Sequence, residues 1–301
     1  MRIPFDKVAD ALKLGLASTH ESHEPVRVSI HVDQSATPFL VSTIREAFVP
    51  LRTTGVVRVH RLTGDPVSIK PDVDIAVVVS CGSPWLERAA HEIVISGTPV
   101  VIVSESSVEV PFVRGDSPML GLVCATDREH LLSSLAAWIL NRTSKGTPLA
   151  ANFAFLRDAA AQDAISQAVV ANAVTGALFF IPGADFPTMT LAQVGMMLKL
   201  SSIYGKGLDL GRAYEAMAIV LVAAALRQAS RTISPRFGRA AIVPKVLIAA
   251  GGTFAMGRAL TALYARDIDY APVTDALRGT FSAHRAHGTE QGASAPEATI
   301  C

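Results

Sequence analysis

Residues 74–80 have the sequence DIAVVVS, the strongest β-strand signal in the chain. The run is rich in β-branched residues and continuously apolar, which is typical of a strand covered on both faces of a parallel sheet. A second run of this kind, TPVVIVS, occupies residues 98–104. Helical patterns lie between and beside these runs. Continuous apolar strands that alternate with helices indicate an open, mostly parallel sheet with helices on both faces.

The same alternation extends over residues 26–145, which we expect to form an α/β domain. Thr37 is placed to cap the first helix, with Pro38 in its first turn, and Asp127 to cap the last. Gly97 is expected to close the helix before the second strong strand. The remaining expected strands are 27–33, 56–60 and 120–125, and the expected helices are 38–49, 84–96 and 128–141.

The pattern changes after Thr143–Pro148, which has the composition of a linker. Residues 150–270 are predicted to form an apolar helical bundle, so the fold class is α/β followed by all-α. Thr190 and Gln193 have the capping-box spacing for the start of a helix. The expected helices are 151–181, 190–204, 209–230 and 240–266.

Several small or polar residues in this second region have expected roles. Gly251, Ala255 and Ala259 form a row of small residues that permits close approach of another helix. Gln167, Asn172 and Gln193 are candidates for hydrogen-bonded polar contacts inside the bundle.

The two ends of the chain differ from both regions. Apolar residues recur at helical spacing near the start, so residues 1–25 are expected to form an amphipathic helix and a linker. The polar residues 277–301 are expected to be a disordered tail.

Composition limits the classes of function. Of the 301 residues, 50% are hydrophobic and 18% are charged, and a net charge of +1 provides no field that would attract nucleic acid. Three cysteines without a C-x-x-C pair fit a reducing cytoplasm. The pairs His20/His23 and His284/His287 lie in polar tails, where solvated side chains are expected instead of metal ligands.

The turn after the first strand, Asp33–Pro38, lacks the residues of a phosphate-binding loop. It contains no Gly and no Lys, and Pro38 removes a backbone donor where a phosphate would bind. No dinucleotide-binding glycine pattern is found, and we expect no cofactor and no catalytic residues. Asp33 and Glu105 lie near the carboxyl ends of strands, where α/β folds place their sites, although carboxylates in loops are usually solvated.

The order of elements in this domain resembles that of a Ras/Era-type small GTPase. DVDIAVVVS stands where that family has the strand after its second switch region, and TPVVIVS where it has the strand that leads to the guanine-reading Asn-Lys-x-Asp. Here Glu105, Ser106 and Ser107 follow instead, and Val123–Thr126 occupies the place of the last guanine loop. The resemblance implies a degenerate GTPase-like domain that has lost its nucleotide motifs.

Residues 160–268 resemble the YcjF-like helical domain of unknown function. In many bacteria this domain follows an Era-type GTPase domain or occurs in membrane-associated proteins, and the resemblance implies the same setting here. It has no established reaction. The residues that carry the resemblance are Ile181–Asp185, Gln193, Met196–Leu198, Ile203–Gly205, Leu208–Asp209 and Gly251–Gly257.

Ala164–Ala184 contains no Lys, Arg, Asp or Glu and is almost long enough to span a bilayer. Of the four expected helices only this first one, with its Phe-Phe-Ile-Pro end, is expected to be able to cross. Insertion partway, with a turn at residues 181–185, is an alternative. The candidate membrane or partner contacts are Phe179, Phe180, Ile181, Pro182, Gly183 and Asp185.

We therefore expect a non-catalytic GTPase-like scaffold coupled to a membrane-associated helical domain, acting in interaction or regulation at the cytoplasmic face of the cell membrane. Its expected partner is the membrane or a helical protein, with possible self-association through the helical domain. Two alternatives are open: a GTP-binding protein or GTPase with an unorthodox phosphate loop, and a soluble cytoplasmic helical module that binds an apolar ligand.

Overall fold

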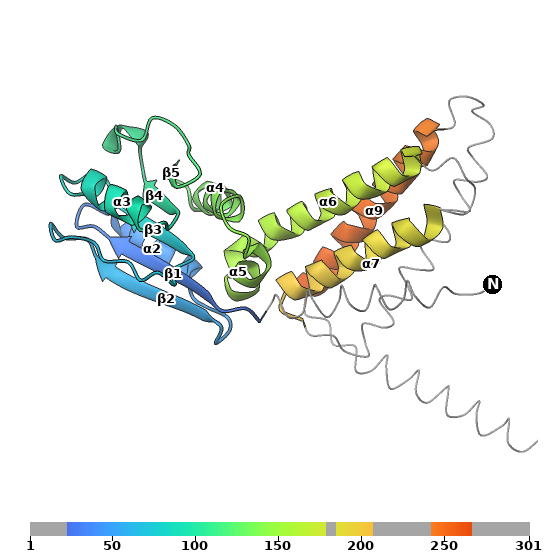
Figure 1. Cartoon of the computed structure of the whole chain (residues 1–301), viewed down its shortest axis with the longest axis horizontal. Coiled ribbons are helices and arrows are strands. Elements are labelled where there is room, and N and C mark those ends of the chain that lie inside the picture. The colour runs from blue at the N-terminus through green and yellow to red at the C-terminus, as the bar shows by residue number, and fades with distance from the viewer. Residues whose placement is uncertain (1–22, 179–184, 207–241, 267–301) are drawn as a thin grey trace, which may run out of the picture.

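The first part of the chain folds around a five-stranded parallel sheet (Figure 1). The computed structural model describes residues 23–178, 185–206 and 242–266. The strand order is β2-β1-β3-β4-β5, and all neighbours are parallel. This order is one of the two common doubly wound arrangements. The strands are β1 (Val26–Val32), β2 (Gly55–Arg61), β3 (Ile75–Val79), β4 (Val100–Ser104) and β5 (Leu120–Cys124).

Helices cover both faces of the sheet, as the sequence predicts. Successive side chains in a strand point to opposite faces, so β3 directs Val77 and Val79 to one side and Ala76 and Val78 to the other. The first side packs against α2 (Pro38–Ala47) and α4 (Arg128–Leu140), and the second against α3 (Leu86–Ile95). We call residues 23–142 the α/β part.

Local chemistry sets the helix ends in the α/β part. Thr37 and Asp127 are the N-caps of α2 and α4, and their side chains accept hydrogen bonds from the backbone N–H of Leu40 and His130. Both predicted caps are therefore confirmed. Gly97 has a φ of +82°, the left-handed conformation expected of a glycine that closes a helix.

The second part of the chain is helical. It contains α5 (Gly146–Asn152), the short 3₁₀ helix η2 (Ala154–Leu156), α6 (Arg157–Leu178), α7 (Asp185–Ile203) and α9 (Ile242–Ala265). We call these elements the helical part. Figure 1 shows α6, α7 and α9 side by side, with α5 between them and the sheet.

Three sequence-based boundaries are wrong. The helix expected at 151–181 begins only at Arg157, because residues 151–152 end α5 and η2 intervenes. The last three residues of Thr143–Pro148, predicted as a linker, belong to α5, and Thr147 and Pro148 are buried. Thr190 and Gln193 were expected at a helix start, but α7 begins at Asp185 and contains both. The physical reason is that a three-residue spacing of this kind also occurs within a helix, where Gln193 instead turns toward α9. The expected helix at 209–230 and both chain ends lie outside the described residues, except for residues 23–25.

The contact between α6 and α9 uses a different face of α9 from the one predicted. Gly251, Ala255 and Ala259 are exposed, whereas Ala249, Thr253 and Gly257 face inward. A Cβ at Gly257 would lie 2.6 Å from Cγ1 of Ile165, so only glycine permits this approach. The row of small residues that brings the helices together is therefore offset by two positions from the expected row.

A buried polar contact joins α6, α7 and α9. The Thr253 hydroxyl accepts hydrogen bonds from the side-chain amides of Asn172, at 2.8 Å, and Gln193, at 3.3 Å, and donates one to the Ala249 carbonyl. Asn172 and Gln193 are therefore confirmed as internal polar contacts. Gln167 is exposed, so its expected place in the interior is wrong.

One hydrophobic cluster runs from the sheet into the helices. Phe153, which joins α5 to η2, is completely buried and has its ring centroid 5.3 Å from that of Phe48. Leu149 and Leu156 are equally buried and belong to the same cluster. The cluster continues through Ile165 of α6, so the two parts share apolar packing across the boundary.

We expect Phe153→Ala to destabilise both parts together. Loss of a fully buried phenylalanine costs about 3–5 kcal/mol, because it removes apolar burial and leaves a cavity. Chemical denaturation followed by circular dichroism measures the change in free energy of unfolding. Phe254→Ala is the matched control, since Phe254 is 46% exposed, and it should cost less than about 1 kcal/mol. Equal effects of the two variants would contradict the shared core.

Candidate functional site

The carboxyl ends of β1 and β3 lie beside each other at the point where the strand order reverses, the usual ligand position in a doubly wound sheet. Asp33 follows β1 there and is only 4% exposed. Its carboxylate accepts hydrogen bonds from the hydroxyls of Ser35 and, at 3.0 Å, Ser80. These hydroxyls in turn accept from the backbone N–H groups of Cys81 and Gly82. The network fixes the first turn of the sheet to the loop after β3.

Asp33 is held in its ionised form. Burial alone would raise the pKa of its carboxyl group, but the hydrogen bonds from Ser35 and Ser80 outweigh burial and the pKa is lowered. The charge is therefore present at neutral pH, in the turn where a phosphate-binding loop would present backbone donors.

A second carboxylate occupies the start of α2. The Thr37 hydroxyl donates a 2.5 Å hydrogen bond to Oε1 of Glu105, which follows β4, while it caps α2. An anion at a helix N-terminus is favoured by the helix dipole and its unpaired N–H groups. Glu105 thus places the chain's own negative charge beside the position that a phosphate would need. The structure brings the sequence candidates Asp33 and Glu105 to the same sheet edge.

The edge continues with further polar groups beside β4. Glu109 accepts hydrogen bonds from the Ser104 hydroxyl and the Ser106 backbone N–H, and the Ser104 bond lowers the pKa of its carboxyl group. Burial raises the pKa of the Cys124 thiol, and the charge of Glu109 raises it further. Cys124 therefore stays protonated at neutral pH, which does not suit a nucleophile.

This edge consists of carboxylates and hydroxyls that are hydrogen-bonded to one another. We call these residues the switch-point cluster: Asp33, Ser35, Thr37, Ser80, Ser104, Glu105 and Glu109. Its hydroxyls already donate to carboxylates within the cluster. Three carboxylates at one edge repel a phosphate electrostatically. Within the described ranges no group of three or more His, Cys, Asp or Glu residues is arranged to hold a metal ion.

A pair of histidines on the neighbouring strands was missed by the sequence analysis. His31 of β1 and His60 of β2 are register partners, and their rings stack with centroids 5.3 Å apart. His31 is 3% exposed, and its Nε2 lies 2.9 Å from the Ser29 hydroxyl. Burial, with a smaller effect of His60, lowers the pKa of His31 to about 4. Only the strand register shows this pair, because the two residues are far apart in sequence.

The buried His31 should make the fold sensitive to mild acid. The unfolded chain takes up a proton at His31 near pH 6.5, whereas the folded chain does so only near pH 4. Stability from this residue is complete above pH 6.5 and is lost as the pH falls, by about 2 kcal/mol between pH 7 and pH 5. Urea denaturation at several pH values measures the slope. His31→Gln should flatten it, and the exposed His91→Gln should leave it unchanged; an unaltered slope in His31→Gln would contradict the assignment.

The outward face of α9 carries exposed apolar side chains. Leu247 is 66% exposed and Phe254 is 46% exposed. They are seven residues apart, on one side of the helix, together with the exposed Gly251 and Ala255. Arg258 is the one charged residue between Val246 and Ala265. Arg258 is exposed on the same side as Leu247 and Phe254, so the outward face is apolar as far as Ala255 and carries one positive charge beyond it.

Among the described helices, Val246–Ala265 of α9 is long and apolar enough to cross a membrane, and only 28% of that stretch is buried. A core helix of a soluble protein can share this length and composition. The prediction that only the first long helix could cross a membrane is therefore wrong for the described residues. The reason is that a single arginine does not disqualify the 20-residue stretch Val246–Ala265.

Most of the predicted contact residues lie outside the described residues. Residues 179–184, which include Phe179, Phe180, Ile181, Pro182 and Gly183, lie outside the described residues. Asp185 is the first residue of α7. Their role as membrane or partner contacts stays a prediction.

Comparisons with protein-family models, curated proteins and solved structures found no match for this chain. The resemblances to small GTPases and to the YcjF-like domain therefore stay predictions from the sequence.

Proposed function

We propose that this protein is a non-catalytic, GTPase-like scaffold whose helical part associates with a membrane, and that it acts in interaction or regulation at the cytoplasmic face of the cell membrane. The observation that carries the proposal is the apolar outward face of α9, with Leu247 and Phe254 exposed. A partner helix, including one from a second copy of the chain, is the other occupant that suits this face.

The α/β part supports a scaffold role through its switch-point cluster. An enzyme that transfers phosphoryl groups needs donors and cations around the phosphates. Here Asp33 and Glu105 occupy that region, and the hydroxyls beside them are engaged. The hydrogen bonds of this cluster hold the loops after β1, β3 and β4 in fixed positions. Such a fixed surface suits recognition by another protein.

The helical part supports association through the chemistry of α9. In lipid there is little hydrophobic drive between helices, so small residues and hydrogen bonds hold them together. Gly257 against Ile165 and the Asn172–Thr253 hydrogen bond supply such contacts inside the helical part. Gly251, Ala255 and Leu247 remain on the outward face, where acyl chains or another helix would contact them.

We expect no measurable binding of GTP or ATP. Loss of several charge-assisted contacts to phosphate, at about 1.5–3 kcal/mol each, removes most of the affinity of a nucleotide site. Titration of the purified protein with each nucleotide and magnesium by isothermal calorimetry tests this. The double variant Asp33→Asn with Glu105→Gln removes the repulsion between these two carboxylates and a phosphate, and serves as a comparison.

A dissociation constant in the micromolar range for the unaltered protein would contradict the scaffold proposal. It would favour a GTPase with an unorthodox phosphate loop instead.

We expect the unaltered protein to sediment with membranes and the double variant Leu247→Asp with Phe254→Asp to be released. A charged side chain in a membrane helix costs about 2.5–3.5 kcal/mol at the bilayer centre. The affected side chains are exposed, so the fold should survive. Cell fractionation with carbonate and detergent washes measures the distribution, and circular dichroism checks the helical content.

Val59→Asp is the matched control, because Val59 on β2 is 66% exposed, as Leu247 is. It should not change the distribution. If the unaltered protein is wholly soluble at physiological salt, membrane association is ruled out, and its oligomeric state then tests the partner-helix alternative.

A further inference from the structure

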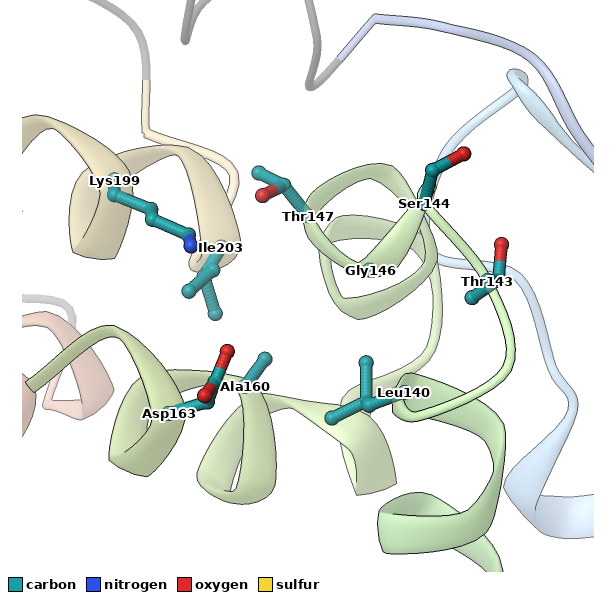
Figure 2. Close-up of a pocket in the computed structure, with 9 residues that line it drawn as sticks. All are labelled: Leu140, Thr143, Ser144, Gly146, Thr147, Ala160, Asp163, Lys199 and Ile203. Atoms are coloured by element: carbon teal, nitrogen blue, oxygen red, sulfur yellow. The ribbon is translucent and has the colours of Figure 1, made fainter. Parts of the chain in front are cut away.

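A small cavity lies where the α/β part meets the helical part. Its volume is about 140 Å³, and it is formed by the end of α4, the start of α5, and the facing sides of α6 and α7 (Figure 2). A cavity of this size accommodates a molecule of about six non-hydrogen atoms. It is separate from the switch-point cluster, because it is lined by residues of α4 to α7 and by none of the loops after β1, β3 and β4.

Thr147 provides a hydroxyl that lacks a protein partner. Its side chain is only 8% exposed, and Figure 2 shows it extending from α5 into the space toward α7. Within the part of the chain that the structure describes, this hydroxyl forms no hydrogen bond. The hydroxyl faces the cavity and is available to donate a hydrogen bond to a molecule bound there.

Charges of opposite sign line the cavity without neutralising each other directly. Lys199 of α7 donates a 3.1 Å hydrogen bond to the neutral amide oxygen of Gln167, and it makes no ion pair among the described residues. The same amide donates a 2.8 Å hydrogen bond to Asp163 of α6. Gln167 therefore bridges the two charges, and the ammonium keeps donors available because it carries three.

The remaining lining is apolar. Leu140, Ala160 and Ile203 each contribute hydrocarbon side chains to the cavity. A site with a few fixed polar groups and an apolar wall is the usual form of a small-molecule site.

We propose that this cavity binds a small zwitterionic amino acid with a short apolar side chain, such as alanine. Its carboxylate would accept hydrogen bonds from Lys199 and Thr147, and its ammonium group would lie near Asp163. The methyl group would contact Leu140 and Ile203. This arrangement uses the unpaired donors, satisfies both signs of charge and fits the volume.

The test uses the full chain and L-alanine as the probe, with binding followed by ligand-observed nuclear magnetic resonance. Binding should be saturable, with a dissociation constant of about 1 mM, because a ligand of this size makes few contacts. Lactate, which lacks the ammonium group, and ethylamine, which lacks the carboxylate, should each bind at least about tenfold more weakly.

Three variants address the proposed contacts. Lys199→Met, Asp163→Asn and Thr147→Val should each weaken alanine binding by about tenfold. Lys70→Met removes an exposed lysine in the α/β part and should leave binding unchanged. Thermal unfolding of each variant verifies that it is folded.

Two results would overturn the proposal. One is the absence of saturable alanine binding by the unaltered, folded protein. The other is binding that Lys199→Met and Asp163→Asn leave unchanged, or that lactate matches, since a zwitterion site requires both charges. Neither result depends on membrane association, so failure here is distinguishable from failure of the proposed function.

Discussion

The burial of Phe153 is the contact on which the arrangement of the described residues depends. Its ring lies against Phe48 at the end of α2, and the adjoining Leu149 and Leu156 extend the same cluster. Asn152 adds hydrogen bonds to this junction: its backbone carbonyl accepts from Leu51, and its side chain pairs with Thr54. The short segment of α5 and η2 that follows α4 thus joins the sheet to the long helices.

The α/β part and the helical part stabilise their buried polar groups in different ways. At the switch point, negative charges are stabilised by hydroxyls and by the start of α2, so the edge is complete without a ligand. In the helices, the neutral side chains of Asn172 and Gln193 meet at Thr253. Each Thr253 contact spans separate helices and therefore helps to fix their relative register. The charged switch-point cluster and the neutral contact at Thr253 suit different surroundings.

The sequence predicts the features that depend on local chemistry. The β-branched runs that became β3 and β4 are strands because their side chains suit burial on both faces, and Thr37 and Asp127 cap helices because their oxygens reach nearby N–H groups. The side of α9 that faces inward could not be predicted, because the helix has no polar stripe to define its orientation. The His31–His60 stack could not be predicted either, since it depends on the pairing of β1 with β2.

The uninterrupted course of α6 has a mechanical consequence. With 22 residues, the helix is about 33 Å long at 1.5 Å per residue. Its first turn follows directly on η2, where Leu156 is anchored in the core, and its length is braced by α9 through the Gly257–Ile165 approach. Such a long, uninterrupted helix is stiff along its axis. A small displacement applied at its far end would be transmitted along the helix to η2 and to the core around Leu156.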